Sequence, residues 1–377
     1  MRASHAILFP LTILALVVGI PNQATADQAS NQQPKYQVEA RVMAWADVSE
    51  RESLPTQRET ITDFFVRRAR LVLTGRPTDS ISFSLQVGQD NIGGKVLTDD
   101  GSIRIKDAYI TYRASDAVQF TAGQFKVPFL RANLESGFNQ VLVDRGTLPG
   151  LRPAREGSRD LGLMAWGNLD RLQYRVAACD GSDQEGRNDG SSIRVSARGA
   201  YNWFSKETGF GYTGTYLGSA RVLHLAAQVD LQSSRLDPRD DAAFATRLRD
   251  YRTWAVEAFF EQPLARAAAF TVDAAWFDRD DDYLEPGVAT RETQGYYVQP
   301  AFLLPGTLGP GRLQFAARHE SWETTRGASS ADTNRTTVGA NYYLGGHDRK
   351  IQADYTWKDE DPEIRNNEFR LSLVVVF

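Results

Sequence analysis

The sequence contains little cysteine and little histidine. Cys179 is the only cysteine, so no disulfide can form within the chain. Beyond the N-terminal region the only histidines are His224, His319 and His347. They stand alone, without the neighbouring nucleophile or the ligand spacing that a catalytic triad or a metal site requires. The sequence therefore predicts no enzyme, no catalytic residue, no metal site and no cofactor.

Long apolar runs are also scarce, and the one that exists lies at the N-terminus. It covers residues 6–20, follows the basic residue Arg2 and precedes the small-residue sequence ATA at 24–26. This order is typical of a cleavable secretory signal peptide, which we predict over residues 1–26. No later segment offers the roughly 18 uninterrupted apolar residues of a bilayer-spanning helix, which excludes a helical membrane protein.

Positive charge is not in excess either. The chain carries 43 Lys and Arg residues against 47 Asp and Glu residues, a net charge of −4. Proteins that bind nucleic acid normally present a basic surface, so no nucleic-acid partner is predicted.

Alternation of apolar and polar residues, in contrast, runs through the chain from Tyr36 onward. Period-two segments of this kind predict strands with one apolar and one polar face. The sixteen predicted strands are 36–46, 64–75, 81–90, 103–113, 117–125, 160–167, 171–179, 192–204, 221–230, 251–261, 268–277, 296–304, 312–320, 335–344, 350–358 and 367–377.

The polar faces of these segments carry arginine. In IRVSARGAY (193–201) the apolar residues share one face, and Arg194, Ser196 and Arg198 share the other. A soluble sandwich rarely buries arginine, whereas a membrane barrel places apolar side chains against lipid and polar ones in a water-filled lumen. Because unpaired backbone groups cannot face hydrocarbon, such strands must close on one another. We predict an all-β fold, a transmembrane antiparallel β-barrel of about sixteen strands over residues 36–377 in outer-membrane lipid.

The predicted connections alternate between short and long. The short ones are 76–80, 114–116, 168–170, 262–267, 305–311 and 345–349. The long, polar ones include 47–63, 91–102, 126–159, 231–250 and 278–295. Short periplasmic turns and long extracellular loops give this pattern when both termini are periplasmic, with residues 27–35 as an N-terminal periplasmic segment. Segment 205–220 departs from the pattern because it is too long for a periplasmic turn.

The chain ends in an alternating strand, NEFRLSLVVVF (367–377). Phe369, Leu371 and Leu373 share one face, and Phe377 is the last residue. The strand resembles the signal recognised by the outer-membrane barrel assembly machinery, which makes that machinery a predicted partner of Phe377. An edge strand of a soluble β protein is the alternative, but its apolar edge would aggregate in water. The predicted location is therefore the bacterial outer membrane.

Four stretches carry a resemblance to a known family. They are FFVRRARLVLTGR (64–76), IRIKDAYITYR (103–113), VQFTAGQFKVPFLRANLESG (118–137) and LPGLRPAREGSRDLGLMAWG (148–167). They resemble the phosphate-selective porin O and P family of outer-membrane porins. This resemblance implies a sixteen-stranded barrel, often a homotrimer, whose third extracellular loop folds inward and narrows the pore. Segment 126–159, between the fifth and sixth predicted strands, is where such a constriction loop belongs.

Basic residues on the inward faces are candidates for binding solute. Arginine offers paired donors to phosphate, and lysine adds a compact charge. The predicted solute-binding residues are Lys126, Arg131, Arg68, Arg70, Arg104, Lys106, Arg175, Arg194 and Arg198. The same arginines could instead pair with carboxylates and brace the constriction, and inward faces also carry acidic residues such as Glu257 and Asp273.

The predicted function is passive diffusion of small hydrophilic solutes through an outer-membrane porin, with a preference for anions such as phosphate or polyphosphate. Two alternatives stay open. One is a general porin without selectivity, because the inward charges have both signs. The other is a structural or adhesive barrel, because long polar loops can bind partners.

Overall fold

A computed structural model of the chain describes residues 36–54, 57–98, 101–146, 159–181, 192–235, 248–360 and 366–377. The predicted signal peptide (1–26) and the segment 27–35 lie outside the described residues. So does part of the predicted constriction loop, which includes Arg152 and Arg155.

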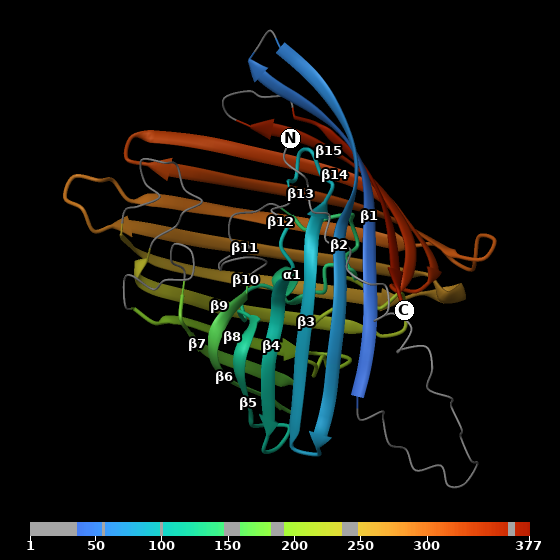
Figure 1. Cartoon of the computed structure of the whole chain (residues 1–377), viewed down its shortest axis with the longest axis horizontal. Coiled ribbons are helices and arrows are strands. Elements are labelled where there is room, and N and C mark those ends of the chain that lie inside the picture. Colours follow the sequence, from blue (N-terminus) through green and yellow to red (C-terminus); the bar gives the residue numbers. More distant parts are fainter. Residues whose placement is uncertain are drawn as a thin grey trace, which may run out of the picture. The chain divides into compact units, whose positions relative to one another are not determined.

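The described residues form sixteen antiparallel strands that close into one barrel. Each strand pairs with its neighbours in the sequence, and β1 pairs with β16 to complete the ring. The strands are β1 (Tyr36–Leu54), β2 (Gln57–Thr78), β3 (Ile81–Ile92), β4 (Arg104–Arg113), β5 (Gln119–Lys126), β6 (Arg159–Leu169), β7 (Leu172–Cys179), β8 (Arg194–Asn202), β9 (Val222–Arg235), β10 (Arg249–Pro263), β11 (Ala269–Tyr283), β12 (Arg291–Leu303), β13 (Arg312–Arg326), β14 (Ser329–Gly345), β15 (Arg349–Glu360) and β16 (Glu368–Val376). Figure 1 shows β1 to β5 along one side of the barrel and β10 to β15 along another. The predicted fold class is confirmed.

The C-terminal strand closes the barrel. In the register of β1 with β16, Ala44 faces Leu373. The backbone N–H of Ala40 donates to the carbonyl of Phe377 at 2.7 Å, and the N–H of Phe377 donates to the carbonyl of Ala40 at 3.0 Å. The last residue of the chain is therefore part of the ladder, which leaves no open sheet edge at this seam.

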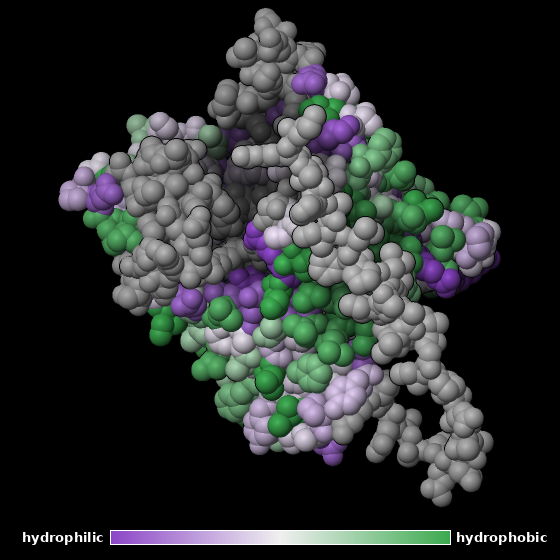
Figure 2. Space-filling model, viewed as in Figure 1, coloured by the Kyte–Doolittle hydropathy of each residue, from purple (hydrophilic) through white to green (hydrophobic). Residues whose placement is uncertain are grey.

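The outer face is apolar and the inner face is polar, as alternation predicts. On β16, Leu371 and Leu373 are exposed on the outside, whereas Ser372 between them is fully buried. Figure 2 shows hydrophobic side chains gathered in the lower part of the view, where Figure 1 places β2 to β5. This division suits a lipid solvent outside and a polar lumen inside.

Several strands extend beyond their predicted ends, so parts of several predicted loops, including 231–250, are wrong. Residues 47–54 and 57–63, predicted as loop, pair as extensions of β1 and β2, with Asp47 opposite Asp63. Predicted loop 278–295 is likewise shortened, because β11 runs to Tyr283 and β12 starts at Arg291. Strand ends that rise above the apolar band carry polar residues on both faces, so the period-two signal is lost there.

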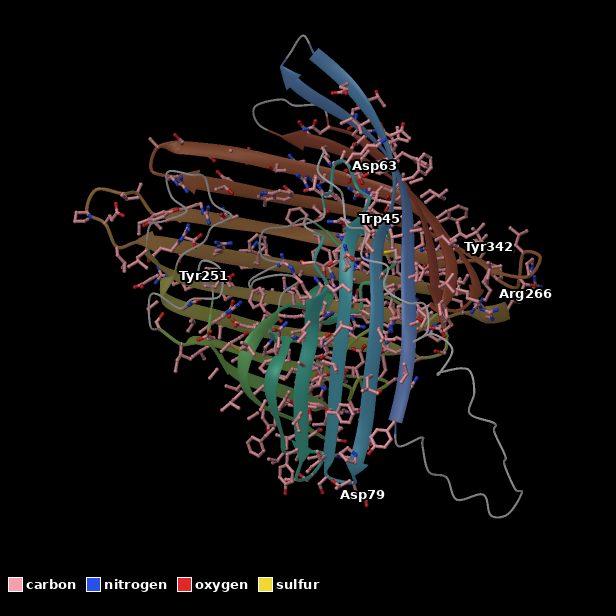
Figure 3. The ribbon with its side chains drawn as sticks, viewed as in Figure 1. Trp45, Asp63, Asp79, Tyr251, Arg266 and Tyr342 are labelled. Carbon is pink, nitrogen blue, oxygen red and sulfur yellow. The ribbon has the colours of Figure 1, made fainter. Side chains whose placement is uncertain are left out.

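The two ends of the barrel differ in their connections. At the turn end, only residues 79–80 join β2 to β3, and only 170–171 join β6 to β7. Figure 3 marks this end with Asp79 and Arg266, and Tyr251 lies toward the opposite, loop end. The connection of β8 to β9 is the exception, because it runs from 203 to 221 at the turn end.

Helical structure is scarce in the described residues. Helix α1 (Arg131–Leu134) is one turn long and lies in the connection of β5 to β6. A further short 3-10 turn covers Ala265–Ala267. Among the residues that the structure describes, no helix is long and apolar enough to cross a membrane.

Candidate functional site

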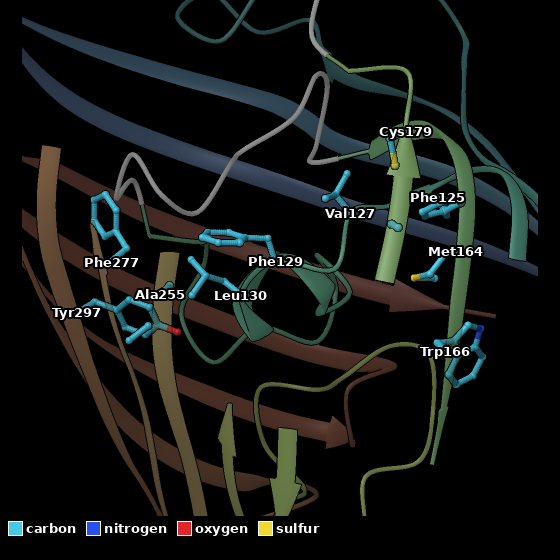
Figure 4. Close-up of a cluster of buried hydrophobic side chains, with 12 residues drawn as sticks. Phe125, Val127, Phe129, Leu130, Met164, Trp166, Cys179, Ala255, Phe277 and Tyr297 are labelled. Atoms are coloured by element: carbon cyan, nitrogen blue, oxygen red, sulfur yellow. The ribbon is translucent and has the colours of Figure 1, made fainter. Parts of the chain in front are cut away.

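The connection between β5 and β6 folds into the barrel, as the resemblance implies. We call it the inward loop; residues 127–146 of it are described. Val127, Phe129 and Leu130 are fully buried. In Figure 4 they lie between side chains of β5 and β6, such as Trp166, and side chains of β10 to β12, such as Phe277. Their burial among the side chains of the barrel wall keeps the loop inside the lumen.

Polar side chains of the wall also bind the backbone of the inward loop. Glu257 accepts the N–H of Arg131 at 2.6 Å, and Asp354 accepts the N–H of Val143 at 2.9 Å. The ammonium of Lys350 donates to the carbonyl of Gln140 at 2.7 Å. These bonds satisfy loop backbone groups that would otherwise be buried without partners.

We call the inner face of β1 to β6 the basic wall. A cavity of about 690 Å³ lies between this wall and the inward loop. Among the described residues, its lining includes nine basic residues and two acidic ones, Asp90 and Asp107. The basic residues are Arg41, Arg67, Arg68, Arg70, Arg104, Lys106, Lys126, Arg145 and Arg159. Aromatic rings of Tyr109 and Phe138 complete part of the lining.

Carboxylates pair with several of these cations. Asp90 pairs with both Arg70 and Lys106, and Asp107 accepts from Arg159 at 2.8 Å. Two acidic residues outside the lining, Glu39 and Asp144, pair with Arg41 and Arg68. Among the described residues that line the cavity itself, nine are basic and two are acidic.

Lys126 and Arg145 meet at one backbone atom of the inward loop. The ammonium of Lys126 and the guanidinium of Arg145 both donate to the carbonyl oxygen of Glu135. Two cations are thereby held side by side at the root of the loop, on the cavity surface.

Two β-bulges place consecutive charged residues inside the lumen. In the pairing of β1 with β2, Met43 faces Arg68 but Ala44 faces Val66, so Arg67 is the extra residue. In the pairing of β3 with β4, Gln86 faces Asp107 and Val87 faces Ile105, so Lys106 is the extra residue. A bulge interrupts strict alternation and re-aims a side chain. Arg67 and Arg68 therefore both line the cavity, as do Lys106 and Asp107.

The nine predicted solute-binding residues fall into two groups. Arg68, Arg70, Arg104, Lys106 and Lys126 line the cavity. The other four, Arg131, Arg175, Arg194 and Arg198, do not belong to that lining, and each is at most 3% exposed. Their partners explain this placement.

Three of these four arginines face the lumen from β7 and β8. We call the inner face of β7 to β10 the braced wall, because its charges are paired. Arg194 forms a two-pronged contact with Asp230, and Arg198 pairs with Glu257. Arg175 donates to the carbonyls of Phe210 at 2.7 Å and Gly209 at 2.9 Å. Basic residues here are bound by the protein itself.

The connection 203–221, which we call the inward turn, also folds into the lumen and meets the inward loop. Tyr212 forms a parallel β-bridge with Glu135, and the N–H of Gly214 donates to the carbonyl of Asn139 at 3.2 Å. Arg131 of the loop pairs with Glu207 of the turn at 2.6 Å. The sequence indicated that segment 205–220 was too long for a turn, but gave no sign that it lies inside the barrel.

The pair between loop and turn is electrostatically strong. Burial opposes ionisation of Glu207, but Arg131, together with His224, outweighs it and holds the pKa of Glu207 below its ordinary value. Burial also opposes the charge of Arg131, yet Glu207 raises the pKa of Arg131 further. Both groups are therefore charged at neutral pH, so the contact is an ion pair between desolvated groups.

The described residues hold no cluster of His, Cys, Asp and Glu side chains that could bind a metal ion. His224 lies in the braced wall, where its Nε2 atom is 2.7 Å from a guanidinium nitrogen of Arg198. His319 contacts Thr336 on exposed strand surface, and His347 lies in the turn between β14 and β15.

A closed barrel with an apolar exterior, a charged lumen and an inward loop defines an outer-membrane channel of the porin type. The sequence bears this out. The chain belongs to the phosphate-selective porin O and P family, whose sequence model matches residues 38–372. No curated protein sequence matches the chain.

Solved structures of outer-membrane proteins share the fold. OmpF of Salmonella typhi, in complex with daunomycin, is 13% identical and has a TM-score of 0.60, over 91% of this chain and 97% of its own. An anion-selective porin from Comamonas acidovorans is 8% identical with a TM-score of 0.57, over 91% and 99%. The trimer form of OmpT from Vibrio cholerae is 11% identical with a TM-score of 0.56, over 91% and 99%. At these identities the likeness concerns the fold.

Proposed function

We propose that this outer-membrane channel passes small hydrophilic solutes by diffusion and prefers anions such as phosphate or polyphosphate. One observation carries the proposal: nine basic residues and only two acidic ones line the described surface of the cavity. Family membership supports it, and so does the anion selectivity of the porin from Comamonas acidovorans.

The chemistry of the basic wall suits a multivalent oxyanion. Seven of the nine cavity cations are arginines, whose planar guanidinium groups offer paired donors to phosphate oxygens. Eight of the cations are spread over β1, β2, β4, β5 and β6, and Arg145 comes from the inward loop, so an anion moves from one to the next without a single deep trap. Passage requires binding that is favourable enough for entry and weak enough for release.

The test is recording from the purified protein in planar bilayers under a KCl gradient. We expect a reversal potential close to the equilibrium potential of chloride rather than that of potassium. Addition of inorganic phosphate should lower the chloride current. A reversal potential at zero would favour a general porin, and one on the potassium side would refute the anion preference. A barrel without conductance would be structural or adhesive.

Export, assembly and oligomeric state belong to the same proposal. Residues 1–26 act as the cleavable signal peptide, Phe377 presents the C-terminal strand to the assembly machinery, and the barrel forms a homotrimer in outer-membrane lipid. The trimer form of OmpT from Vibrio cholerae supports the last point. Electrophoresis of unheated protein should give a trimer that separates into monomers on heating, and a monomer under both conditions would contradict it.

A further inference from the structure

The inward turn carries three residues, Phe210, Gly211 and Tyr212, that line the same cavity as the basic wall. They come from the turn end of the barrel, whereas the inward loop comes from the loop end. Two segments that enter from opposite ends therefore bound the same cavity.

The ring of Phe210 is fixed in place. It stacks on Tyr109 of β4, with ring centroids 5.2 Å apart and planes at 30°. Trp166 of β6 meets it edge-on at 5.8 Å, and the guanidinium of Arg175 lies 5.4 Å from its centroid. Contacts of this kind add to the burial energy of an aromatic ring and define its orientation.

Three of the arginines that lie off the cavity lining hold the turn. Arg175 donates to the backbone carbonyls of Phe210 and Gly209. Arg198 donates to the hydroxyl of Tyr212 at 2.8 Å. Arg131 donates to the carbonyl of Thr213 at 2.8 Å, besides its ion pair with Glu207.

The geometry points to the inward turn as a second constriction segment of the channel. Residues 210–212 form one side of the solute path and set its width, while Arg131, Arg175 and Arg198 are positioning residues that hold the turn there. A solute in the cavity thus meets both the cations of the lining and a rigid aromatic surface. This assignment rests on the proposed channel function, but not on anion preference.

Gly211 and Gly209 provide a matched pair for the test. Both are exposed. A Cβ atom added at Gly211 would meet only the carbonyl of Leu134, at 3.5 Å, and one added at Gly209 only the carbonyl of Gly211, at 3.4 Å. Neither glycine has a positive φ. Both positions therefore accept a side chain, yet only Gly211 belongs to the cavity lining.

The experiment introduces Gly211→Cys or Gly209→Cys into a Cys179→Ser background and applies charged methanethiosulfonate reagents during bilayer recording. We expect modification at 211 to cause a stepwise loss of single-channel conductance and modification at 209 to leave it unchanged. A thiol at 211 that labels without loss of conductance, or that does not label, would overturn the assignment.

The charge of the reagent that reacts faster tests anion preference separately from the constriction. An anionic reagent should react faster at 211 if the cavity attracts anions. Faster reaction of the cationic reagent, together with the same loss of conductance, would refute anion preference and support the constriction.

Arg175 tests the positioning role. Arg175→Met removes both donors to the turn, and we expect larger neutral polyethylene glycols to enter the channel. Arg175→Lys, which keeps a donor and the charge, should partly restore the exclusion limit. An unchanged limit in a folded Arg175→Met barrel would show that the arginine does not hold the turn.

Discussion

The basic wall and the braced wall carry the same residue types on their inward faces, but these residues have different partners. The cavity beside the basic wall is lined by nine described cations, eight from the wall and Arg145 from the inward loop, and by two acidic residues. On the braced wall, Arg194 and Arg198 are matched by Asp230 and Glu257, and Arg175 binds backbone carbonyls of the inward turn. An inward arginine thus either lines the cavity or holds another part of the protein. Which role it has depends on whether a protein segment occupies the lumen in front of it.

The ion pairs of the two walls should contribute differently to stability. A buried ion pair is hard to break because the remaining charge loses its partner without gaining water. The pair of Arg41 with Glu39 on the basic wall keeps more contact with solvent, and such a pair is worth less because solvent screens it. Charges of the braced wall should therefore matter for stability, and charges of the basic wall for ion preference.

The largest expected effect is on stability, at Arg194. Arg194→Met leaves Asp230, which is fully buried, without its ion-pair partner. We expect a loss of about 3–5 kcal/mol in the free energy of unfolding. Urea unfolding of the barrel in lipid vesicles measures it.

Arg41→Met is the matched control on the basic wall. Arg41 pairs with Glu39, and both side chains are about one-quarter exposed, at 23% and 25%. Its loss should cost less than about 1 kcal/mol. Equal losses at the two positions would remove the energetic difference between the walls.

The second expected effect is a pH dependence of the stability of the barrel, caused by His347 beside the inward turn. His347 contacts the carbonyl of Thr215 at 2.9 Å. Burial, followed by the charge of Lys350, lowers the pKa of His347 to about 4, from an ordinary value of 6.5. As pH falls below 6.5, the unfolded chain therefore takes up a proton that the folded protein does not.

The contribution of His347 to the stability of the barrel should then be constant above about pH 6.5 and fall by about 1.4 kcal/mol per pH unit between pH 6.5 and 4, levelling off below. His347→Gln should flatten the curve in that window. A slope that survives the substitution would assign the pH dependence to other groups.

A smaller effect concerns Lys126 and Arg131, two of the predicted solute-binding residues. Lys126 lines the cavity, whereas Arg131 is buried against Glu207. Lys126→Gln should lower the anion-to-cation permeability ratio by at least roughly fivefold, because a unit charge about 4 Å from the solute contributes about 1 kcal/mol in water for each ion, with opposite sign for anion and cation.

The double variant Arg131→Gln, Glu207→Gln removes a neutral pair from the lumen, and the permeability ratio should not change. Reversal potentials under a KCl gradient measure both variants. A larger change in the double variant than in Lys126→Gln would mean that the loop-turn contact sets selectivity.

The sequence predicted the barrel well because its physical cause is local. Lipid outside and water inside impose a period of two, and all sixteen predicted strands are present. The polar extensions of β1 and β2 were missed because above the apolar band neither face is selected by lipid.

The site was predicted only in part because its geometry depends on distant contacts. Alternation placed Arg68 and Arg198 on inward faces alike, but could not reveal that the inward turn and Glu257 would bind the second. Arg67 was missed because its place in the lumen follows from a bulge, which the register of β2 with β1 determines. Adjacent arginines in FFVRRAR were the one available sign of it.

The most direct test of the account compares the reversal potential of the unaltered channel with that of the triple variant Arg67→Gln, Arg68→Gln, Arg70→Gln under the same KCl gradient. These three residues supply one-third of the nine described cavity cations, and all three come from one strand. The account predicts a potential on the chloride side for the unaltered channel and a clear shift toward potassium in the variant. Identical potentials in the two proteins would contradict the claim that the basic wall determines ion preference.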